Sequence, residues 1–266
     1  MPSPGPSPSS SSSSDSKCCL LVTGASGNLG RLVLLHLLDT LGIPPCRLVA
    51  GSRTPENLQA FANRGVLTRY LDFRDASSVL DAAQFVDRAI LRAVTGSAGN
   101  RLTGYTFLRN SVYYDNHAVW IAGNSHRSGA WLSAAGRGKL AGIARTDAAF
   151  AAAVALATTR NDAQEIYELA STEGLTIDEM AATIGKAIGK PIYSVHVSED
   201  DLIDGIIQRT GVRPAIAQAF ASLDAHIAHG LAQPRGDDFE RLTGRPPMTH
   251  AQWIEANRAE LLRLVY

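Results

Sequence analysis

A short apolar segment that runs into a glycine-rich turn constrains the fold of this chain more than any other feature. Leu20 to Thr23 is typical of a buried parallel strand, and Gly24, Gly27 and Gly30 follow it. The leucine-rich segment from Arg31 to Leu38 then predicts a helix. Three glycines on their own could mark only a turn. With a strand before them and a helix after them, they predict a dinucleotide-binding βαβ unit, whose helix N-terminus binds the pyrophosphate.

The spacing of these glycines is G-x-x-G-x-x-G, which differs from the common G-x-G-x-x-G fingerprint. The segment Thr-Gly-Ala-Ser-Gly-Asn-Leu-Gly at residues 23–30 resembles the short-chain dehydrogenase/reductase superfamily, in its extended and atypical branches. The resemblance implies a doubly wound parallel sheet.

The end of the second predicted strand, Arg47 to Ala50, indicates which dinucleotide binds. An NAD-specific site places Asp or Glu about 20 residues beyond the glycine turn, where it contacts the ribose hydroxyls. This chain has Gly51-Ser52-Arg53 there instead. Ser52 and Arg53 leave room for a 2′-phosphate and offer it a guanidinium, so NADP(H) is favoured over NAD(H). The alternative is that Arg53 is a solvated surface arginine.

A helix is predicted from Pro55 to Asn63 and a third strand from Val66 to Leu71, which leads into Asp72-Phe73. In the superfamily that the chain resembles, an Asp here lies beside the adenine. The alternative is a turn or helix-capping carboxylate, for which Asp75 is the better candidate. The predicted cofactor contacts are Thr23, Gly24, Ser26, Gly27, Asn28, Leu29, Gly30, Ser52, Arg53, Asp72 and Phe73.

Motifs in the second half narrow the resemblance to NmrA-like atypical short-chain reductases, in the subgroup of NAD(P)H:quinone oxidoreductases and triphenylmethane reductases. The resemblance as a whole extends from about Cys18 to the C-terminus. The motifs are Tyr-Thr-Phe-Leu-Arg-Asn at 105–110, Ile-Ala-Arg-Thr-Asp at 143–147, Ile-Tyr-Glu-Leu-Ala at 166–170, Leu-Thr-Ile-Asp-Glu-Met-Ala at 175–181, Gly-Lys-Pro-Ile at 189–192 and Leu-Thr-Gly-Arg-Pro-Pro at 242–247.

Measured against that family, one internal block is missing. The segment from Ser77 to Val94 predicts one helix or two abutting helices with no strand between them. A strand, a helix and a strand of the doubly wound fold are therefore absent, a unit of roughly 30 residues. The first strand then becomes an edge unless Thr103 to Leu108 pairs with it. Either the chain is a genuine shortened form with a repaired sheet, or it is an incorrectly spliced reading of a normal reductase gene, and the second interpretation is favoured.

The candidate substrate site follows the Tyr-Thr-Phe-Leu-Arg strand, because such sheets bind ligands at the carboxyl ends of their strands. The family position of this segment implies that it lines the substrate pocket, although a polar loop over packed aromatics is an equal alternative. No tyrosine has lysine four residues later, so the usual short-chain dehydrogenase pair is absent and no catalytic residue is assigned. The predicted substrate-binding residues are Arg109, Asn110, Tyr113 and Tyr114, with His117 and Trp120 nearby.

The balanced charge of the chain, 25 basic and 25 acidic residues among 266, argues against nucleic acid or an anionic membrane as the main partner. Its three cysteines show no disulfide or metal spacing, which favours a reduced, cytoplasmic protein. We therefore expect an α/β fold with three parts. These are a disordered Ser/Pro-rich tail at 1–17, a shortened Rossmann-like NAD(P)-binding domain at 18–160 and a smaller, mostly helical substrate-binding region at 161–266.

Three functions remain open from the sequence. The first is an NADPH-dependent oxidoreductase that transfers hydride to a quinone-like or other conjugated small molecule. The second is a non-catalytic, NADP-sensing regulatory protein like the NmrA regulators, and the third is an inactive shortened form. The missing Tyr-x-x-x-Lys pattern fits the first two equally well.

Overall fold

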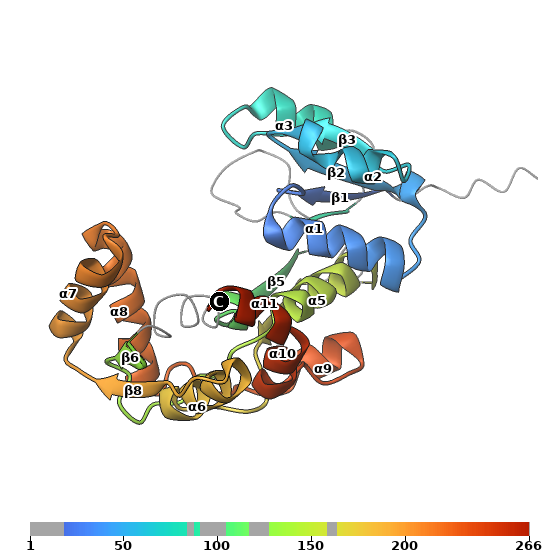
Figure 1. Ribbon diagram of the computed structural model, residues 1–266. Coiled ribbons are helices and arrows are strands. Elements are labelled where there is room, and N and C mark those ends of the chain that lie inside the picture. Colours follow the sequence, from blue (N-terminus) through green and yellow to red (C-terminus); the bar gives the residue numbers. More distant parts are fainter. Residues whose placement is uncertain (1–18, 84–87, 91–104, 117–127, 159–163, 266) are drawn as a thin grey trace, which may run out of the picture.

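The computed structural model describes residues 19–83, 88–90, 105–116, 128–158 and 164–265. The predicted disordered tail therefore lies outside the described residues, as do Cys18, His117 and Trp120. Figure 1 shows a mixed α/β chain with the first sheet at one end and most of the later helices at the other.

The first sheet is fully parallel and has the strand order β3-β2-β1-β4. Its first three strands and the helix after β1 confirm the predicted nucleotide-binding half of a doubly wound fold. Helix α1 continues into a π-helical turn, η1, and a short 3-10 turn precedes the next helix. The elements are β1 (Leu20–Thr23), α1 (Asn28–Leu35), η1 (His36–Thr40), η2 (Pro45–Arg47), β2 (Leu48–Ser52), η3 (Pro55–Leu58), α2 (Gln59–Ala62), β3 (Leu67–Tyr70), α3 (Ala76–Ala83) and β4 (Arg88–Ile90).

Strand β4 corrects the expectation that Ser77 to Val94 is helical throughout. Helix α3 ends at Ala83, and residues 88–90 pair in parallel with β1, with Leu20 opposite Arg88 and Val22 opposite Ile90. An unpaired edge at β1 would leave its buried backbone N–H and C=O groups without partners. Pairing with a distant strand therefore overrides the local helix preference of this segment.

The segment that the sequence suggests as the one alternative partner for β1 pairs elsewhere. Strand β5 (Tyr105–Asn110) pairs in parallel with β7 (Gln164–Leu169) in a separate two-stranded sheet, and β6 (Ala130–Ser133) pairs with β8 (Tyr193–His196). The second pairing joins a strand before residue 160 to one after it. The predicted domain boundary at that residue stays a prediction.

The C-terminal part is mostly helical, and two of its helices begin with capping boxes. Thr176 caps α6 together with Glu179, and Thr249 caps α10 together with Gln252. In Figure 1, α7 and α8 form a lobe beside β6 and β8. The helices are α6 (Ile177–Ile188), α7 (Glu199–Thr210), α8 (Pro214–Ala228), α9 (Asp238–Thr243), α10 (His250–Ala256) and α11 (Arg258–Arg263).

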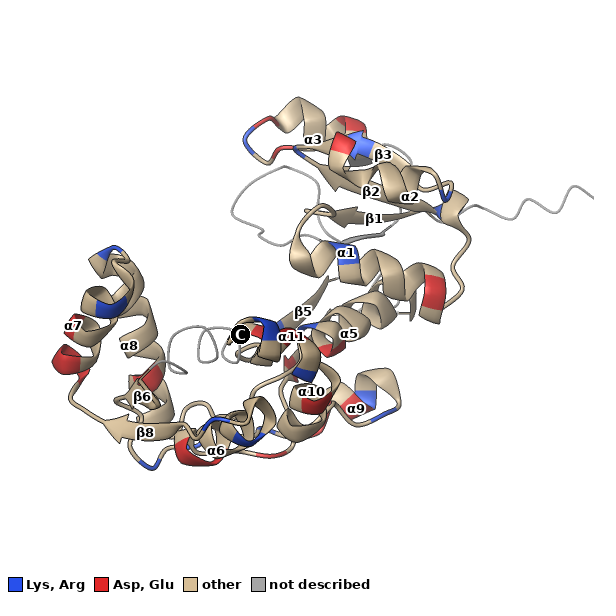
Figure 2. Cartoon of the chain, in the orientation of Figure 1, with Lys and Arg blue, Asp and Glu red and all other residues tan. Residues whose placement is uncertain are grey.

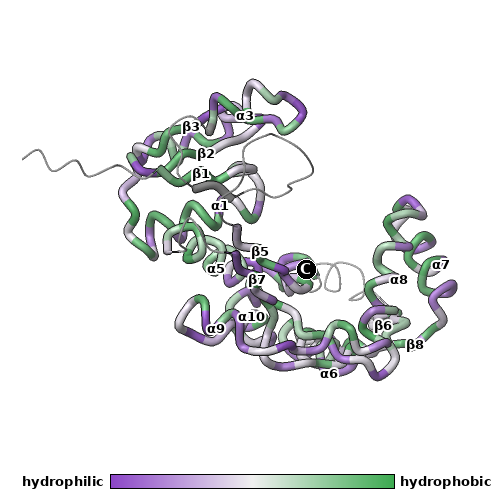
Figure 3. Tube along the Cα trace, turned by 180° about the vertical axis from the view of Figure 1, so that it is seen from behind, coloured by the Kyte–Doolittle hydropathy of each residue, from purple (hydrophilic) through white to green (hydrophobic). Residues whose placement is uncertain are grey.

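Helix α5 (Arg145–Thr158) links the parts of the fold. It packs against α1, and the small side chains of its buried alanines allow close approach. The colouring in Figure 3 shows hydrophobic residues along β1, β2 and the two packed helices. Leu29 from α1 and Leu108 from β5 each contact both the core around β1 and the core around β7. The two sheets are therefore held together by one continuous apolar layer.

Figure 2 shows that basic and acidic residues are interspersed over the described elements. None of the helices in the described part of the chain has the length and hydrophobicity that a membrane crossing requires.

Candidate dinucleotide and substrate site

The turn after β1 folds as a compact loop at the N-terminus of α1. Gly24 has a φ of 61°, in the left-handed region that favours glycine, and its carbonyl accepts a hydrogen bond from the Gly27 N–H at 2.9 Å. Gly27 then serves as the N-cap residue in extended geometry, and no side chain caps the helix. The first N–H groups of α1 are therefore available to an anion.

Each of the later glycines has a different steric role. A Cβ on Gly30 would lie 2.4 Å from the carbonyl oxygen of Gly24 and 2.9 Å from the Cα of Ala25, so this residue lets the helix close against the turn. A Cβ on Gly27 would meet only the Gly24 oxygen, at 3.2 Å. Among the described residues, the space above Gly27 is thus open to a pyrophosphate that approaches as in other dinucleotide-binding folds.

The structure brings the ends of β1, β2 and β3 together at one edge of the sheet. The hydroxyls of Ser26 and Ser52 are 2.7 Å apart, and the Thr54 N–H donates to the Ser52 hydroxyl at 3.0 Å. The Leu71 N–H donates to the Ser52 carbonyl at 3.0 Å, which places Asp72 beside the end of β2. Ser26, Ser52 and Asp72, which come from three separate segments, therefore lie together at one edge of the sheet. We call this edge the ledge.

Charged groups on this ledge interact with one another. Arg74 donates to Asp72 at 2.8 Å, and this hydrogen bond, helped by the nearby charge of Arg53, lowers the pKa of Asp72 to about 2. Arg53 itself is exposed, and so is Phe73. The guanidinium of Arg53 is thus placed at the edge where the sequence predicts a 2′-phosphate.

Two of the predicted contacts lie in the core. Thr23 is buried at the end of β1, and the side chain of Leu29 packs into the apolar layer between the sheets. Any contact from Leu29 to a cofactor would have to come from its backbone N–H. A pattern of residue types cannot separate a backbone contact from a side-chain contact.

The predicted substrate residues follow β5, and they divide into two groups. Arg109 pairs with Glu168 at 2.7 Å across the β5–β7 sheet, and the Asn110 amide donates to the Tyr113 hydroxyl at 2.8 Å. Tyr114 is instead buried, with its ring centroid 5.1 Å from that of His250. Burial raises the pKa of Tyr114 to about 12, so it stays neutral over the ordinary pH range.

A cavity of about 430 Å³ opens at the carboxyl ends of β5 and β7. This volume lies in the usual range for small-molecule sites. Arg109 and Asn110 line it, whereas no residue of the described glycine turn does. Sequence reasoning missed the opposite wall, which comes from α8 and the loop after it, because no motif links them to β5. The residues missed are Ala219, Ser222, Leu223, His226, Leu231, Ala232, Gln233 and Arg235.

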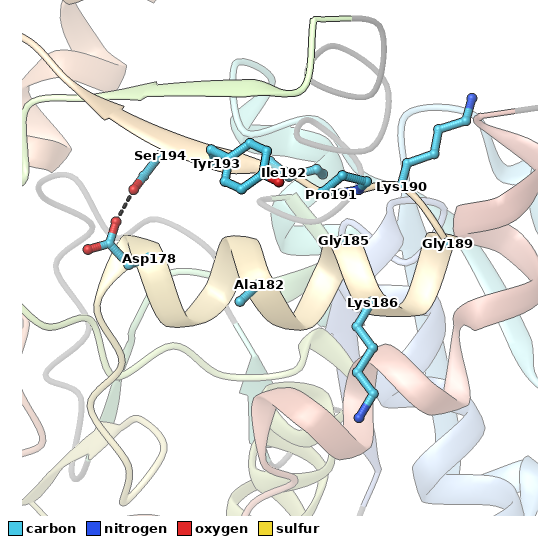
Figure 4. Close-up of a pocket in the computed structure, with 10 residues that line it drawn as sticks. All are labelled: Asp178, Ala182, Gly185, Lys186, Gly189, Lys190, Pro191, Ile192, Tyr193 and Ser194. Atoms are coloured by element: carbon cyan, nitrogen blue, oxygen red, sulfur yellow. Dashed lines mark hydrogen bonds between the residues drawn. The ribbon is translucent and has the colours of Figure 1, made fainter.

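A second cavity, of about 620 Å³, lies between α6 and β8 (Figure 4). Asp178 accepts a hydrogen bond from Ser194 at one end of it, while the side chains of Lys186 and Lys190 point away from the groove. None of the predicted site residues lines this cavity. Although it is the larger of the two, it does not lie at the strand ends where the predicted chemistry belongs.

Comparison with known proteins tests the family resemblance that the sequence motifs indicate. Quinone oxidoreductase 2 of Escherichia coli is 26% identical over 282 residues, which cover 88% of this chain and 97% of that protein. The crystal structure of the NADPH-dependent quinone oxidoreductase of E. coli with NADPH has a TM-score of 0.78 at 25% identity and covers 89% of this chain and 99% of that one. The resemblance to NmrA-like reductases is confirmed.

A second solved structure agrees in fold. The structure of the Citrobacter sp. triphenylmethane reductase complexed with NADP(H) has a TM-score of 0.74 at 22% identity, covering 93% of this chain and 100% of that one. No family model matches the chain.

The alignment with the E. coli protein also bears on the internal block that this chain lacks. It spans 282 positions but takes in only 88% of the 266 residues, so gaps must fall on the side of this chain. Such gaps agree with an internal segment that the relative has and this chain lacks.

Proposed function

We propose that this chain is an NADPH-dependent oxidoreductase that transfers hydride to a quinone-like or other conjugated small molecule. The observation that carries the proposal is the glycine turn, with an uncapped helix N-terminus and open space above Gly27, in a chain related over most of its length to a quinone oxidoreductase. NADPH bound there supplies the hydride. The chain itself is required mainly to bind and orient the two reactants and to exclude water.

The ledge at the strand ends provides the groups that this binding needs. The N–H groups of Asn28 and Leu29 at the start of α1 would bind the pyrophosphate. Arg53 would bind the 2′-phosphate, and Asp72 and Phe73 would lie along the adenosine part. The cavity at the ends of β5 and β7, with Arg109 and Asn110 in its wall, is the site we assign to the substrate. Tyr113 supports that wall through its bond to Asn110.

The assay for this proposal is the consumption of NADPH in the presence of a simple 1,4-benzoquinone. Oxidation of NADPH that depends on both protein and quinone supports hydride transfer. A sensor of the NmrA-regulator type would bind NADPH without consuming it, and that result would replace the proposal. The relatives found for this chain carry oxidoreductase names, which favours the enzyme.

Arg53→Ala is expected to weaken the binding of NADPH roughly tenfold while leaving that of NADH nearly unchanged, because only NADPH carries the 2′-phosphate. Titration of the nicotinamide fluorescence measures both affinities. Arg69→Ala provides a matched control, since Arg69 is an exposed arginine on the neighbouring strand β3 that donates only to the carbonyl of Thr68. Equal losses for both cofactors would remove Arg53 from the 2′-phosphate site.

A further inference from the structure

The cavity at the ends of β5 and β7 carries an uneven distribution of charge. Its charged lining residues are Arg109, Arg235 and Glu168, with His226 as a further basic group. Glu168 is bonded to Arg109 at 2.7 Å, which neutralises one guanidinium. Arg235 donates only to the Leu231 carbonyl, at 3.3 Å, and no carboxylate of the described residues forms an ion pair with it. One positive charge in the wall is therefore left without a counter-charge.

His226 adds a polar group on the same side. Its Nδ1 lies 2.8 Å from the Ser222 carbonyl oxygen, one turn earlier on α8. A carbonyl can only accept, so Nδ1 carries the proton and Nε2 is the ring nitrogen left for a ligand. The amide of Gln233 lines the cavity beside it. The Gln233 amide can donate a hydrogen bond to an anion that Arg235 attracts, whereas Nε2 of His226 can accept one from a hydroxyl elsewhere on the ligand.

Apolar side chains make up much of the remaining wall, beside the polar Asn110, Ser111 and Ser222. Val112 and Leu169 come from the strand ends, and Leu223 faces them from α8. A concave site with apolar walls concentrates the field of a single charge, and a guanidinium matches a carboxylate with two parallel hydrogen bonds. The cavity thus combines apolar side chains, which a ring can contact, with the guanidinium of Arg235, which has no carboxylate partner among the described residues.

From this arrangement we infer that the cavity selects an anionic substrate, namely an aromatic or quinoid ring that bears a carboxylate, with Arg235 as the residue that determines this specificity. The inference rests on the proposed function only in calling the ligand a substrate. The preference for the anion follows from the lining of the cavity. A neutral ring of the same shape fits the apolar wall but leaves the guanidinium without a partner.

The test uses redox-inert probes, so that it does not depend on turnover. The full chain with saturating NADPH is titrated calorimetrically with 2-naphthoate and with 2-naphthamide, which share a ring and differ in charge. We expect the carboxylate to bind roughly tenfold more tightly, with a ratio that falls as salt is added. Arg235→Gln should bring the ratio of the two affinities close to one. Arg213→Gln is the control, because Arg213 is the N-cap residue of α8 and does not line the cavity, and it should leave the ratio unchanged.

Equal affinities for the two probes in the unaltered chain, or a ratio that survives Arg235→Gln, would overturn the inference. Failure of the proposed function has a different signature, because NADPH would then not be consumed with any quinone while the preference for the carboxylate would persist. If quinones do turn over, kcat/KM for a carboxylated quinone should exceed that for its carboxamide by a similar factor, and Arg235→Gln should remove the difference.

Discussion

Gly30→Ala is expected to lower the free energy of unfolding by about 2–3 kcal/mol. Alanine at an ordinary helical position would instead stabilise the protein by roughly 1 kcal/mol relative to glycine. The sign reverses here because the added Cβ would lie 2.4 Å from the Gly24 carbonyl oxygen and 2.9 Å from the Ala25 Cα. Both are backbone atoms of the tight turn, so neither can rotate away. Urea-induced unfolding measures the change.

Gly205→Ala is the matched control for this substitution. Gly205 also lies within a helix, α7, but its added Cβ would meet only the end of the Leu132 side chain, at 2.6 Å, which can change rotamer. We expect its stability to stay within about 1 kcal/mol of the unaltered chain. A Gly30→Ala protein as stable as the Gly205→Ala protein would show that α1 does not close against the turn as described.

Gly27→Val should fold but fail to bind NADPH, because the side chain would occupy the pyrophosphate position.

Arg245→Ala is expected to cost about 2–3 kcal/mol of stability. Arg245 donates at 2.7 Å to Asp147, which is 1% exposed at the start of α5, and its guanidinium lies 4.7 Å from the ring centre of Phe150. Without the arginine, a buried carboxylate keeps only the Met248 N–H, at 2.6 Å. These contacts give Arg245 a structural role.

The contrast with Arg241→Ala tests whether burial sets the size of this effect. Arg241 pairs with Asp238 at 2.6 Å, but its side chain is 60% exposed, so solvent screens the pair and the loss should stay below about 1 kcal/mol. Arg245→Lys should lie between the two, because lysine keeps the charge without the planar fork. Thermal or urea denaturation of the three variants ranks them. Equal losses for Arg241→Ala and Arg245→Ala would contradict the claim that the burial of Asp147 makes its pair with Arg245 the more stabilising of the two.

Features set by local sequence were predictable, and features set by distant pairing were not. The strand at Leu20–Thr23 and the glycine turn each depend on a few neighbouring residues, and the structure confirms both. Strand β4 has three residues and forms because β1 needs a partner, which no local pattern reveals. The same reason explains why the pairing of β5 with β7 was not foreseen.

The candidate site was predictable to a similar extent. Arg109 and Asn110 were placed near the substrate from the end of one strand, and they line the cavity. Arg235 and His226 lie more than 100 residues later, in segments without a recognisable motif. Tyr114 carries the aromatic and polar character of a binding residue, yet it packs with His250 and Trp253 in the core. Residue type alone does not distinguish a ring that lines a pocket from one that fills a core.

A consequence of the shortened sheet remains visible on the outer face of β5 and β7. Tyr105, Phe107 and Ile166 point outward there and are 39%, 50% and 45% exposed. In a doubly wound fold such a face is covered by a crossover helix. The exposed side chains agree with the absence of the strand-helix-strand unit, and they make the stability of this chain the first question for its function.

The most direct test of the account is therefore a thermal melt of the full chain, alone and with NADPH at a hundred times its dissociation constant. A ligand that binds only the folded state stabilises it by about 2.7 kcal/mol at that concentration. We expect a single cooperative transition whose midpoint rises by roughly 5–10 °C with NADPH. A chain with no cooperative transition, or with one that NADPH does not move, would contradict the claim that the shortened sheet closes around a working dinucleotide site.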